Sequence, residues 1–259
     1  VTREHAAHAH DMSHLRREMI ALALRRAGDD ALLAEPAFEV FFAARQCVEC
    51  YADALPALER LAARYRAHPA LHAIEVLNEP RWDVPTDYLK AYYEDAYARI
   101  RKHCAPEKVA VVFHDGFRSF REYLGFMQAP AFCNVVFDYH RYQCFERGDI
   151  DMDIHGHIRK AAVDWREEAD AINVELGLPA ICGEWSLGLD LKVVSLWAEG
   201  PFNHALEHLD RFEQDVASRA YGDSQLITFE RLGGWFFWSY KTETTPAWCL
   251  RACVERGWL

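Results

Sequence analysis

The sequence predicts an α/β fold with a parallel sheet, in the form of an incomplete (β/α)8 barrel of the TIM type. From residue 72 onward, five short apolar runs alternate with longer helix-like segments, without an internal linker or low-complexity segment. Tandem strand-then-helix units of this kind favour a parallel sheet, and we favour a barrel over an open doubly wound sheet. The chain has 259 residues, and a single α/β barrel of about 250 residues is common at this size.

The five apolar runs have the length and composition of buried parallel strands. The first stops at Asn78-Glu79-Pro80, because proline cannot donate to a ladder and the chain leaves the sheet there. The fourth ends at Gly183, and Glu184 follows at once. In chain order, the expected strands are residues 73–77, 108–113, 134–139, 180–182 and 234–238.

Amphipathic segments around these runs predict the helices of the barrel portion. The first covers residues 53–68, with an expected apolar stripe made of Leu55, Leu58, Leu61 and Tyr65. The other expected helices are residues 88–104, 118–127, 154–176, 203–220 and 246–254.

Residues 1–46 have a mostly helical pattern and form a leader of undefined role, whereas residues 47–259 form the barrel portion. Ser13 is a candidate cap for a helix over residues 15–26, and residues 40–42 fit either a helix or a short strand. A closed barrel of eight strands needs three more than the five found. We therefore expect the leader to pack against the gap as helices, or the chain to self-associate through an open sheet edge.

The composition excludes several classes of partner. The formal net charge of −11 argues against nucleic acid and anionic membrane surfaces. No apolar run reaches the roughly 18 residues of a membrane span, and the polar first residues do not form a visible signal peptide. The sequence thus predicts a soluble protein, without indicating its compartment. No glycine-rich nucleotide motif is present, and we expect no cofactor.

Cysteine and histidine patterns give little support to a metal site. Cys47-Val-Glu-Cys50 has no second C-x-x-C, and His204 and His208 share a helix face without a visible third ligand. The N-terminal histidines, the first of which is His5, fit a frayed terminus better than a ligand set. We therefore expect no metal and no disulfide framework.

Polar residues follow the end of each expected strand, and two of them are the carboxylates Glu79 and Glu184. Because the carboxyl ends of parallel strands share one edge of a sheet, we expect these two side chains to face each other. Two carboxylates suit glycoside hydrolysis, in which one is protonated to assist the leaving oxygen and the other attacks the anomeric carbon. Tyr142 or His140 would donate a hydrogen bond to Glu184 and keep it ionised.

Four ordered motifs together resemble glycoside hydrolase family 5, and within it the exo-β-1,3-glucanase branch. They are Asn78-Glu79-Pro80, His140-Arg-Tyr142, Gly183-Glu184-Trp185-Ser186 and Gly234-Trp-Phe-Phe-Trp-Ser-Tyr-Lys-Thr-Glu243. Two further stretches, His114-Asp-Gly-Phe117 and Asp138-Tyr-His-Arg-Tyr-Gln-Cys-Phe145, are similar to the same branch. The resemblance runs from about residue 50 to the C-terminus.

The resemblance implies a (β/α)8 barrel and a retaining double displacement on a β-glucan or β-glucoside. It implies that Glu79 is the acid/base and Glu184 the nucleophile, with Trp238 stacking under the reacting sugar and Phe145 clamping the next one. The substrate-binding residues expected at the site are Asn78, Asp115, His140, Tyr142, Phe145 and Trp238.

The residues that this family carries on its first three strands have no match in residues 1–46. Two alternatives therefore stay open beside a β-1,3-glucan hydrolase. One is a truncated, catalytically weak, carbohydrate-binding remnant of such an enzyme. The other is a family-5 enzyme that acts on another β-glycan or on a glycolipid.

Overall fold

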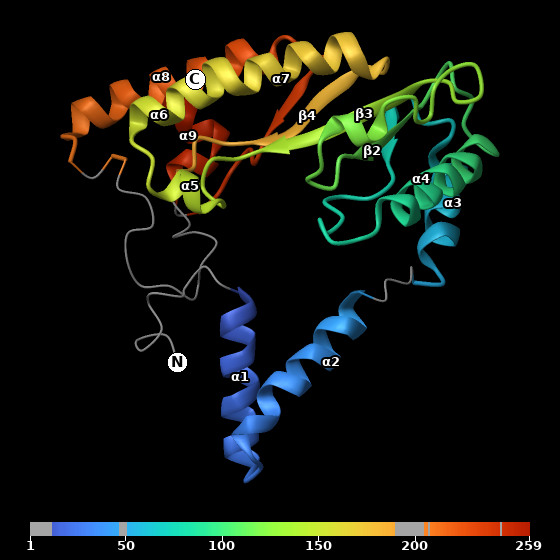
Figure 1. Cartoon of the computed structure of the whole chain (residues 1–259). Coiled ribbons are helices and arrows are strands. Elements are labelled where there is room, and N and C mark those ends of the chain that lie inside the picture. The colour runs from blue at the N-terminus through green and yellow to red at the C-terminus, as the bar shows by residue number, and fades with distance from the viewer. Residues whose placement is uncertain (1–11, 47–50, 190–204, 207, 244) are drawn as a thin grey trace. The chain divides into compact units, whose positions relative to one another are not determined.

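The computed structural model describes residues 12–46, 51–189, 205–206, 208–243 and 245–259 (Figure 1). These residues fall into two compact units, and the second unit begins at Tyr51 and contains the whole sheet. The helices that precede residue 47 belong to the first unit.

The first unit is a pair of helices joined by a short turn. Its elements are α1 (Met12–Ala27), η2 (Ala31–Leu33) and α2 (Ala34–Gln46). Gly28, with a φ of 83°, follows α1 where the sequence predicts its end. Arg17 of α1 pairs with Glu35 of α2 at 2.8 Å and lies over the Phe38 ring. Residues 40–42, for which helix and strand were both open, are helical.

The second unit is built on five parallel strands. They are β1 (Ala73–Glu75), β2 (Ala110–His114), β3 (Val135–Arg141), β4 (Ala180–Trp185) and β5 (Trp235–Phe237). The strands lie side by side in the same order as in the chain, so the strand order does not reverse anywhere across the sheet. A doubly wound sheet requires such a reversal, so the order confirms the predicted incomplete barrel.

Helices connect successive strands of the second unit (Figure 1). They are α3 (Ala54–Tyr65), α4 (Thr86–Arg101), η3 (Phe120–Tyr123), α5 (Arg147–Ile150), α6 (Ile154–Arg159), η4 (Lys160–Asp164), α7 (Trp165–Ala171), η5 (Ile172–Leu176), α8 (Arg211–Phe229), η6 (Pro246–Trp248) and α9 (Leu250–Glu255). The segment from α6 to η5 is one continuous helical run with two π-helical portions. The Thr228 hydroxyl donates to the Ala161 carbonyl in the first of these portions, at 2.7 Å.

Several expectations about the helices are wrong in detail, and of residues 118–127 only η3 is helical. Helix α8 begins at Arg211 rather than at residue 203, because Asp210 and Glu213 form a capping box that starts the helix there. In α3, Leu61 and Tyr65 are exposed, and Ala62 occupies the buried position between them. A period of 3.6 residues carries the buried stripe to position 62 rather than to positions 61 and 65.

The two faces of the sheet differ in chemistry. The face under the helices carries a cluster of wholly buried aromatic rings made of Phe113, Phe137, Tyr139 and Trp185. The opposite face, called the open face below, carries Glu75, Asp138, His140 and Phe236, among other residues. The candidate site therefore lies on the polar side of the sheet.

Among the helices of the described residues, none is both long and apolar enough to cross a membrane.

Candidate active site

The two predicted carboxylates meet at one imidazole nitrogen. The Nδ1 atom of His140 lies 2.6 Å from Oε1 of Glu79 and 3.6 Å from Oε2 of Glu184. These two carboxylate oxygens are therefore separated by at most the sum of the two distances, 6.2 Å. The side chain of His140 is 1% exposed, whereas that of Glu79 is 34% exposed, so Glu79 faces solvent and His140 lies beneath.

Local backbone geometry directs each carboxylate. Glu79 has a φ of 44°, in a left-handed region that glutamate rarely adopts, and buried Pro80 follows it. Such outliers concentrate at functional sites. In β4, Tyr139 is opposite Cys182 but His140 is opposite Glu184, so Gly183 is an extra residue in the ladder. This bulge turns Glu184 toward the open face, which strict alternation from Cys182 would not do.

His140 carries a positive charge over a wide pH range. Its Nε2 atom lies 3.5 Å from Oδ2 of Asp138. Burial lowers its pKa, but hydrogen bonds and charges from Asp138 and Glu79, and the charge of Glu184, outweigh burial and raise the pKa to about 10. The imidazolium therefore donates toward Oε1 of Glu79 through Nδ1, and Oε2 is left to carry a proton when Glu79 is in its acid form.

His114 packs edge-to-face against His140, with ring centroids 4.3 Å apart. Complete burial lowers its pKa to about 2, with the nearby His140 and Arg141 charges acting in the same direction. Its Nδ1 atom accepts a hydrogen bond from the Gly116 amide at 2.8 Å, which places the proton of the neutral ring on Nε2. His114 is thus a neutral ring that packs against the positively charged ring of His140.

Tyr142 donates a hydrogen bond to Oε2 of Glu184 at 2.7 Å. Its ring is held on one side by the buried Trp248, with centroids 5.2 Å apart, and is edge-on to Phe145 at 5.4 Å. Burial raises the pKa of Glu184, against the opposing effects of Tyr142 and His140. The Tyr142 hydrogen bond and the His140 charge therefore favour the ionised carboxylate in a site whose burial disfavours it.

The aromatic rings predicted to contact sugar are open to solvent. Phe145 is 50% exposed and Trp238 is 53% exposed, and Asn78 beside Glu79 is also exposed. Trp238 is held to the end of β4, because its amide donates to the Trp185 carbonyl at 2.8 Å.

Asp115 occupies a different environment from the other expected site residues. It is 1% exposed, and its Oδ1 atom accepts a hydrogen bond from the Phe117 amide at 2.8 Å. Its backbone carbonyl accepts from the Tyr123 hydroxyl, and its Oδ2 atom lies 3.7 Å from Arg141. These contacts shape the loop after β2, and the burial leaves no exposed carboxylate surface for a sugar.

Two triads on the open face have metal-like spacing. Glu79, His114 and His140 form one, and Glu75, Asp138 and His140 form the other, with ligand atoms within 4.8 Å of one another. In the first, Nε2 of His114 carries a proton and offers no lone pair. In the second, loss of hydration and the Asp138 charge raise the pKa of Glu75 to about 8, so Glu75 is largely protonated at neutral pH. We assign neither triad to a metal.

The cysteine pair at positions 47 and 50, the histidine-rich start and His204 lie outside the described residues. Cys249 and Cys253, in the described part, are free thiols.

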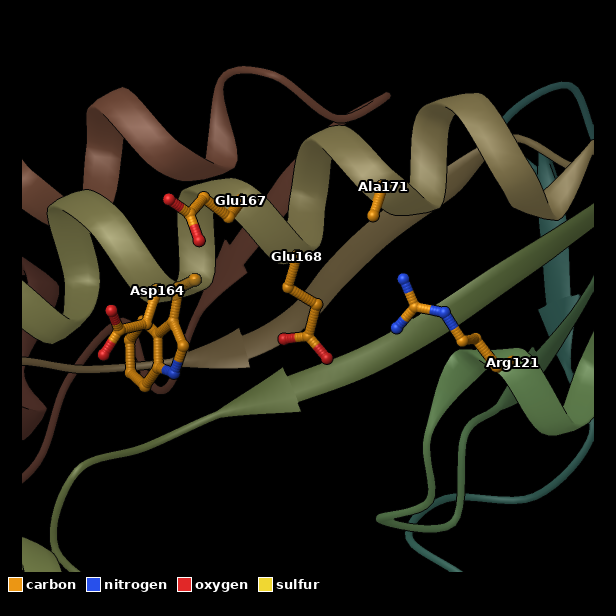
Figure 2. Close-up of a pocket in the computed structure, with 6 residues that line it drawn as sticks. Arg121, Asp164, Glu167, Glu168 and Ala171 are labelled. Carbon is orange, nitrogen blue, oxygen red and sulfur yellow. The ribbon is translucent and has the colours of Figure 1, made fainter.

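A surface hollow of about 410 Å³ is lined by residues of η3, η4 and α7 (Figure 2). Arg121 of η3 and Glu168 of α7 point toward it (Figure 2). Arg121 already pairs with Glu175 at 2.9 Å, and Glu168 pairs with Arg141 at 2.7 Å. The hollow shares no residue with the carboxylate site.

The chain is similar in sequence to several known proteins. A glucan 1,3-beta-glucosidase of Candida oleophila is 34% identical over 209 residues, which make up 71% of this chain and 47% of the relative. A probable glucan 1,3-beta-glucosidase A of Emericella nidulans is 33% identical over 223 residues, which make up 78% of this chain and 53% of the relative. This chain is a relative of the glucan 1,3-beta-glucosidases. It spans about half the length of these curated relatives.

These relatives confirm the resemblance to the exo-β-1,3-glucanase branch of glycoside hydrolase family 5 that the motifs predict. No protein-family model matches the chain. Among solved structures, the rutinosidase from Aspergillus niger is 16% identical with a TM-score of 0.55, over 79% of this chain and 56% of that protein. This likeness supports the fold.

Two residues that contact the candidate site were given no site role in the sequence analysis. Asp138 lies two positions before His140, and residues two apart on a strand share a face, so alternation alone could have found it. Trp248 lies more than a hundred residues from Tyr142, and no local signal connects them.

Proposed function

We propose that this chain carries the catalytic half of a retaining β-glucoside hydrolase, with a β-1,3-glucan or a related β-glucoside as substrate. The observation that carries the proposal is the contact of both carboxylates with Nδ1 of His140. It brings their nearest oxygens within 6.2 Å, below the roughly 6.5–9.5 Å that leaves room for a water in an inverting enzyme.

In the proposed mechanism, Glu79 begins protonated and Glu184 ionised. Glu184 attacks the anomeric carbon while Glu79 gives its proton to the glycosidic oxygen, so the aglycone leaves as an alcohol and a glycosyl ester forms on Glu184. Glu79 then takes a proton from water, whose oxygen attacks the same carbon and releases Glu184. Glu79 thus acts as the acid in the first step and as the base in the second, while Glu184 alternates between a free carboxylate and a glycosyl ester.

Neighbouring residues assist each carboxyl. The Tyr142 hydroxyl at 2.7 Å stabilises the anionic Glu184. The solvent-facing position of Glu79 suits a group that exchanges its proton with the leaving alcohol and then with water. We expect Asn78, His140 and Phe145 to contact the sugar, with Trp238 beneath its ring, as the resemblance implies.

A weakly active carbohydrate-binding protein is the second candidate, and the exposed aromatic residues of β5 favour it. Phe236 of β5 is 63% exposed, and Trp238, directly after β5, is 53% exposed. Exposed rings next to a polar sheet would still bind sugar, while incomplete walls would hold it too loosely for rapid reaction.

Hydrolysis of laminarin and of an aryl β-glucoside by the wild type, Glu79→Gln and Glu184→Gln distinguishes the two candidates. Hydrolysis by the wild type that both variants lose supports the enzyme. Binding of laminarin without hydrolysis by the wild type supports the second candidate. Equal activity in the wild type and Glu184→Gln would contradict the mechanism.

The free edges of the described sheet also support a prediction of self-association. β1 and β5 each pair with one strand only among the described residues, and unpaired strand edges readily add another strand. Sedimentation of the purified chain over a range of concentrations tests this prediction, and a monomer throughout would contradict it.

A further inference from the structure

Asp138 of β3 belongs to the same face of the sheet as His140, two positions later, and its side chain is buried there. It is 2% exposed, and its two carboxylate oxygens have different partners on two strands. Oδ1 accepts a hydrogen bond from the Gly183 amide of β4 at 2.7 Å. Oδ2 lies 3.5 Å from Nε2 of His140.

The first of these contacts stabilises the β4 bulge. Gly183 is the residue without a partner on β3, so its amide is available to a side chain rather than to the ladder. Asp138 accepts that amide, and a Cβ atom at Gly183 would overlap its carboxylate. Because the bulge turns Glu184 to the open face, this contact acts on the position of the nucleophile.

The second contact orients the imidazole. With Nε2 directed at Asp138, Nδ1 of His140 points at Oε1 of Glu79, 2.6 Å away. An imidazole that is fixed at one nitrogen by a carboxylate presents the other in a defined direction. The same carboxylate therefore acts on the acid/base through one oxygen and on the nucleophile through the other.

Glu75 supports this arrangement from β1. As a whole residue it is exposed, but its carboxyl has an oxygen within 4.8 Å of Asp138, and loss of hydration followed by the Asp138 charge raises its pKa to about 8. A protonated Glu75 places no second negative charge beside Asp138.

We propose that Asp138 is a positioning residue that holds both candidate catalytic carboxylates in register, through Gly183 on one side and His140 on the other. This inference rests on the proposed function for its catalytic meaning, but the arrangement itself can be tested without turnover. The groups that face His140 and set its charge are Glu75, Glu79, His114, Asp138 and Glu184.

The test compares Asp138→Asn with Asp149→Asn by NMR titration of the His140 ring and by steady-state kinetics on an aryl β-glucoside. Asparagine keeps an acceptor for Gly183 but removes the charge beside His140. Asp149 is an equally buried carboxylate, paired with Lys160 outside the site, and serves as the matched control. Urea unfolding of each variant monitors the fold.

We expect Asp138→Asn to lower the His140 pKa by at least about one unit, as loss of an adjacent opposite charge does. We expect kcat to fall by about tenfold to a hundredfold with a much smaller change in KM, because the carboxylates lose alignment rather than substrate contacts. Asp149→Asn should leave the His140 titration unchanged. An unchanged His140 titration in folded Asp138→Asn would overturn the proposal, as would a lowered His140 pKa with unchanged kcat.

A second pair of variants, Gly183→Ala and its control Gly234→Ala, tests the contact between Asp138 and Gly183 from the side of β4. A Cβ at Gly183 would overlap Asp138, whereas one at Gly234 would have open space. Gly183→Ala should also shift the His140 titration, and Gly234→Ala should not. If the wild type hydrolyses no glucoside, the proposed function fails, and the His140 titrations alone still decide whether Asp138 positions this ring.

Discussion

Removal of the Tyr142 hydroxyl tests how a half-buried carboxylate is kept ionised for attack. Tyr142→Phe deletes the donor that lies 2.7 Å from Oε2 of Glu184 and leaves the ring between Trp248 and Phe145. A hydrogen bond to a charged group contributes about 1.5–3 kcal/mol. At about 1.36 kcal/mol per pKa unit, the pKa of Glu184 should rise by about one to two units.

The sign follows from the proton states of the mechanism. Burial already raises the pKa of Glu184, and Tyr142 opposes that effect. Loss of the hydroxyl leaves burial less opposed, so a larger fraction of Glu184 is protonated at a given pH. The acidic limb of the pH profile of kcat/KM reports ionisation of the nucleophile in the free enzyme. We expect this limb to move to higher pH by the same one to two units.

The assay is the pH dependence of kcat/KM on an aryl β-glucoside, accompanied by carbon NMR titration of the Glu184 carboxyl. Tyr97→Phe is the matched control, because the hydroxyl of Tyr97 in α4 hydrogen bonds with the backbone carbonyl and amide of Cys133, before β3. The control should lose about 0.5–1.5 kcal/mol of unfolding free energy without moving the acidic limb. A Glu184 titration that moves by less than about half a unit in Tyr142→Phe would refute the reasoning.

Three further changes probe the surroundings of the site. In the wild type the pKa of Glu75 is raised on folding, so the stability that protonated Glu75 contributes is lost as the pH rises from about 4.5 to about 8. The urea midpoint of the wild type should therefore fall over this pH range, and that of Glu75→Gln should not. Plots of urea midpoint against pH that run parallel for the two proteins would contradict this prediction. Trp185→Ala should lower the unfolding free energy by about 3–5 kcal/mol, because Trp185 is wholly buried against Phe229 and Phe237, whereas exposed Tyr240→Ala should change it by less than about 0.5 kcal/mol. In Gly188→Ala a Cβ would overlap the indole of Trp248, which packs against Tyr142, so kcat/KM should fall. Gly234→Ala should leave kcat/KM unchanged, because a Cβ there meets open space. Equal kcat/KM in both variants would show that the contact of Trp248 with Tyr142 is dispensable.

Local signals in the sequence were sufficient for the strands and for both carboxylates. Asn78-Glu79-Pro80 and Gly183-Glu184 each combine a strand end with an acidic residue, and a parallel sheet brings such ends to one edge. The sequence could not show that Gly183 is an extra residue in β4, because a bulge is defined by the partner strand. It also could not show that Asp115 is buried while Glu79 is half open, since both follow a strand and differ only in what packs over them.

The start of α8 was predicted too early, because apolar residues precede the residue that caps the helix. Asp210 and Glu213 form a reciprocal pair of hydrogen bonds that fixes the start of α8, although apolar residues occur before it. A capping box of this kind satisfies two backbone donors at the first turn, which an apolar pattern alone cannot do. The signal was present in the sequence at a spacing of three residues.

The incomplete sheet affects binding and chemistry to different degrees. The contacts that hold the two candidate catalytic carboxyls run among the segment after β1, β3 and β4, through His140, Asp138 and Gly183. The aromatic rings of β5 instead stand exposed at the edge of the sheet, with Phe236 and Trp238 open to solvent. A site of this kind should lose substrate affinity before it loses the alignment of its carboxyls. We therefore expect any hydrolysis to show a high KM, and labelling of Glu184 by an activated glucoside to saturate only at high concentration.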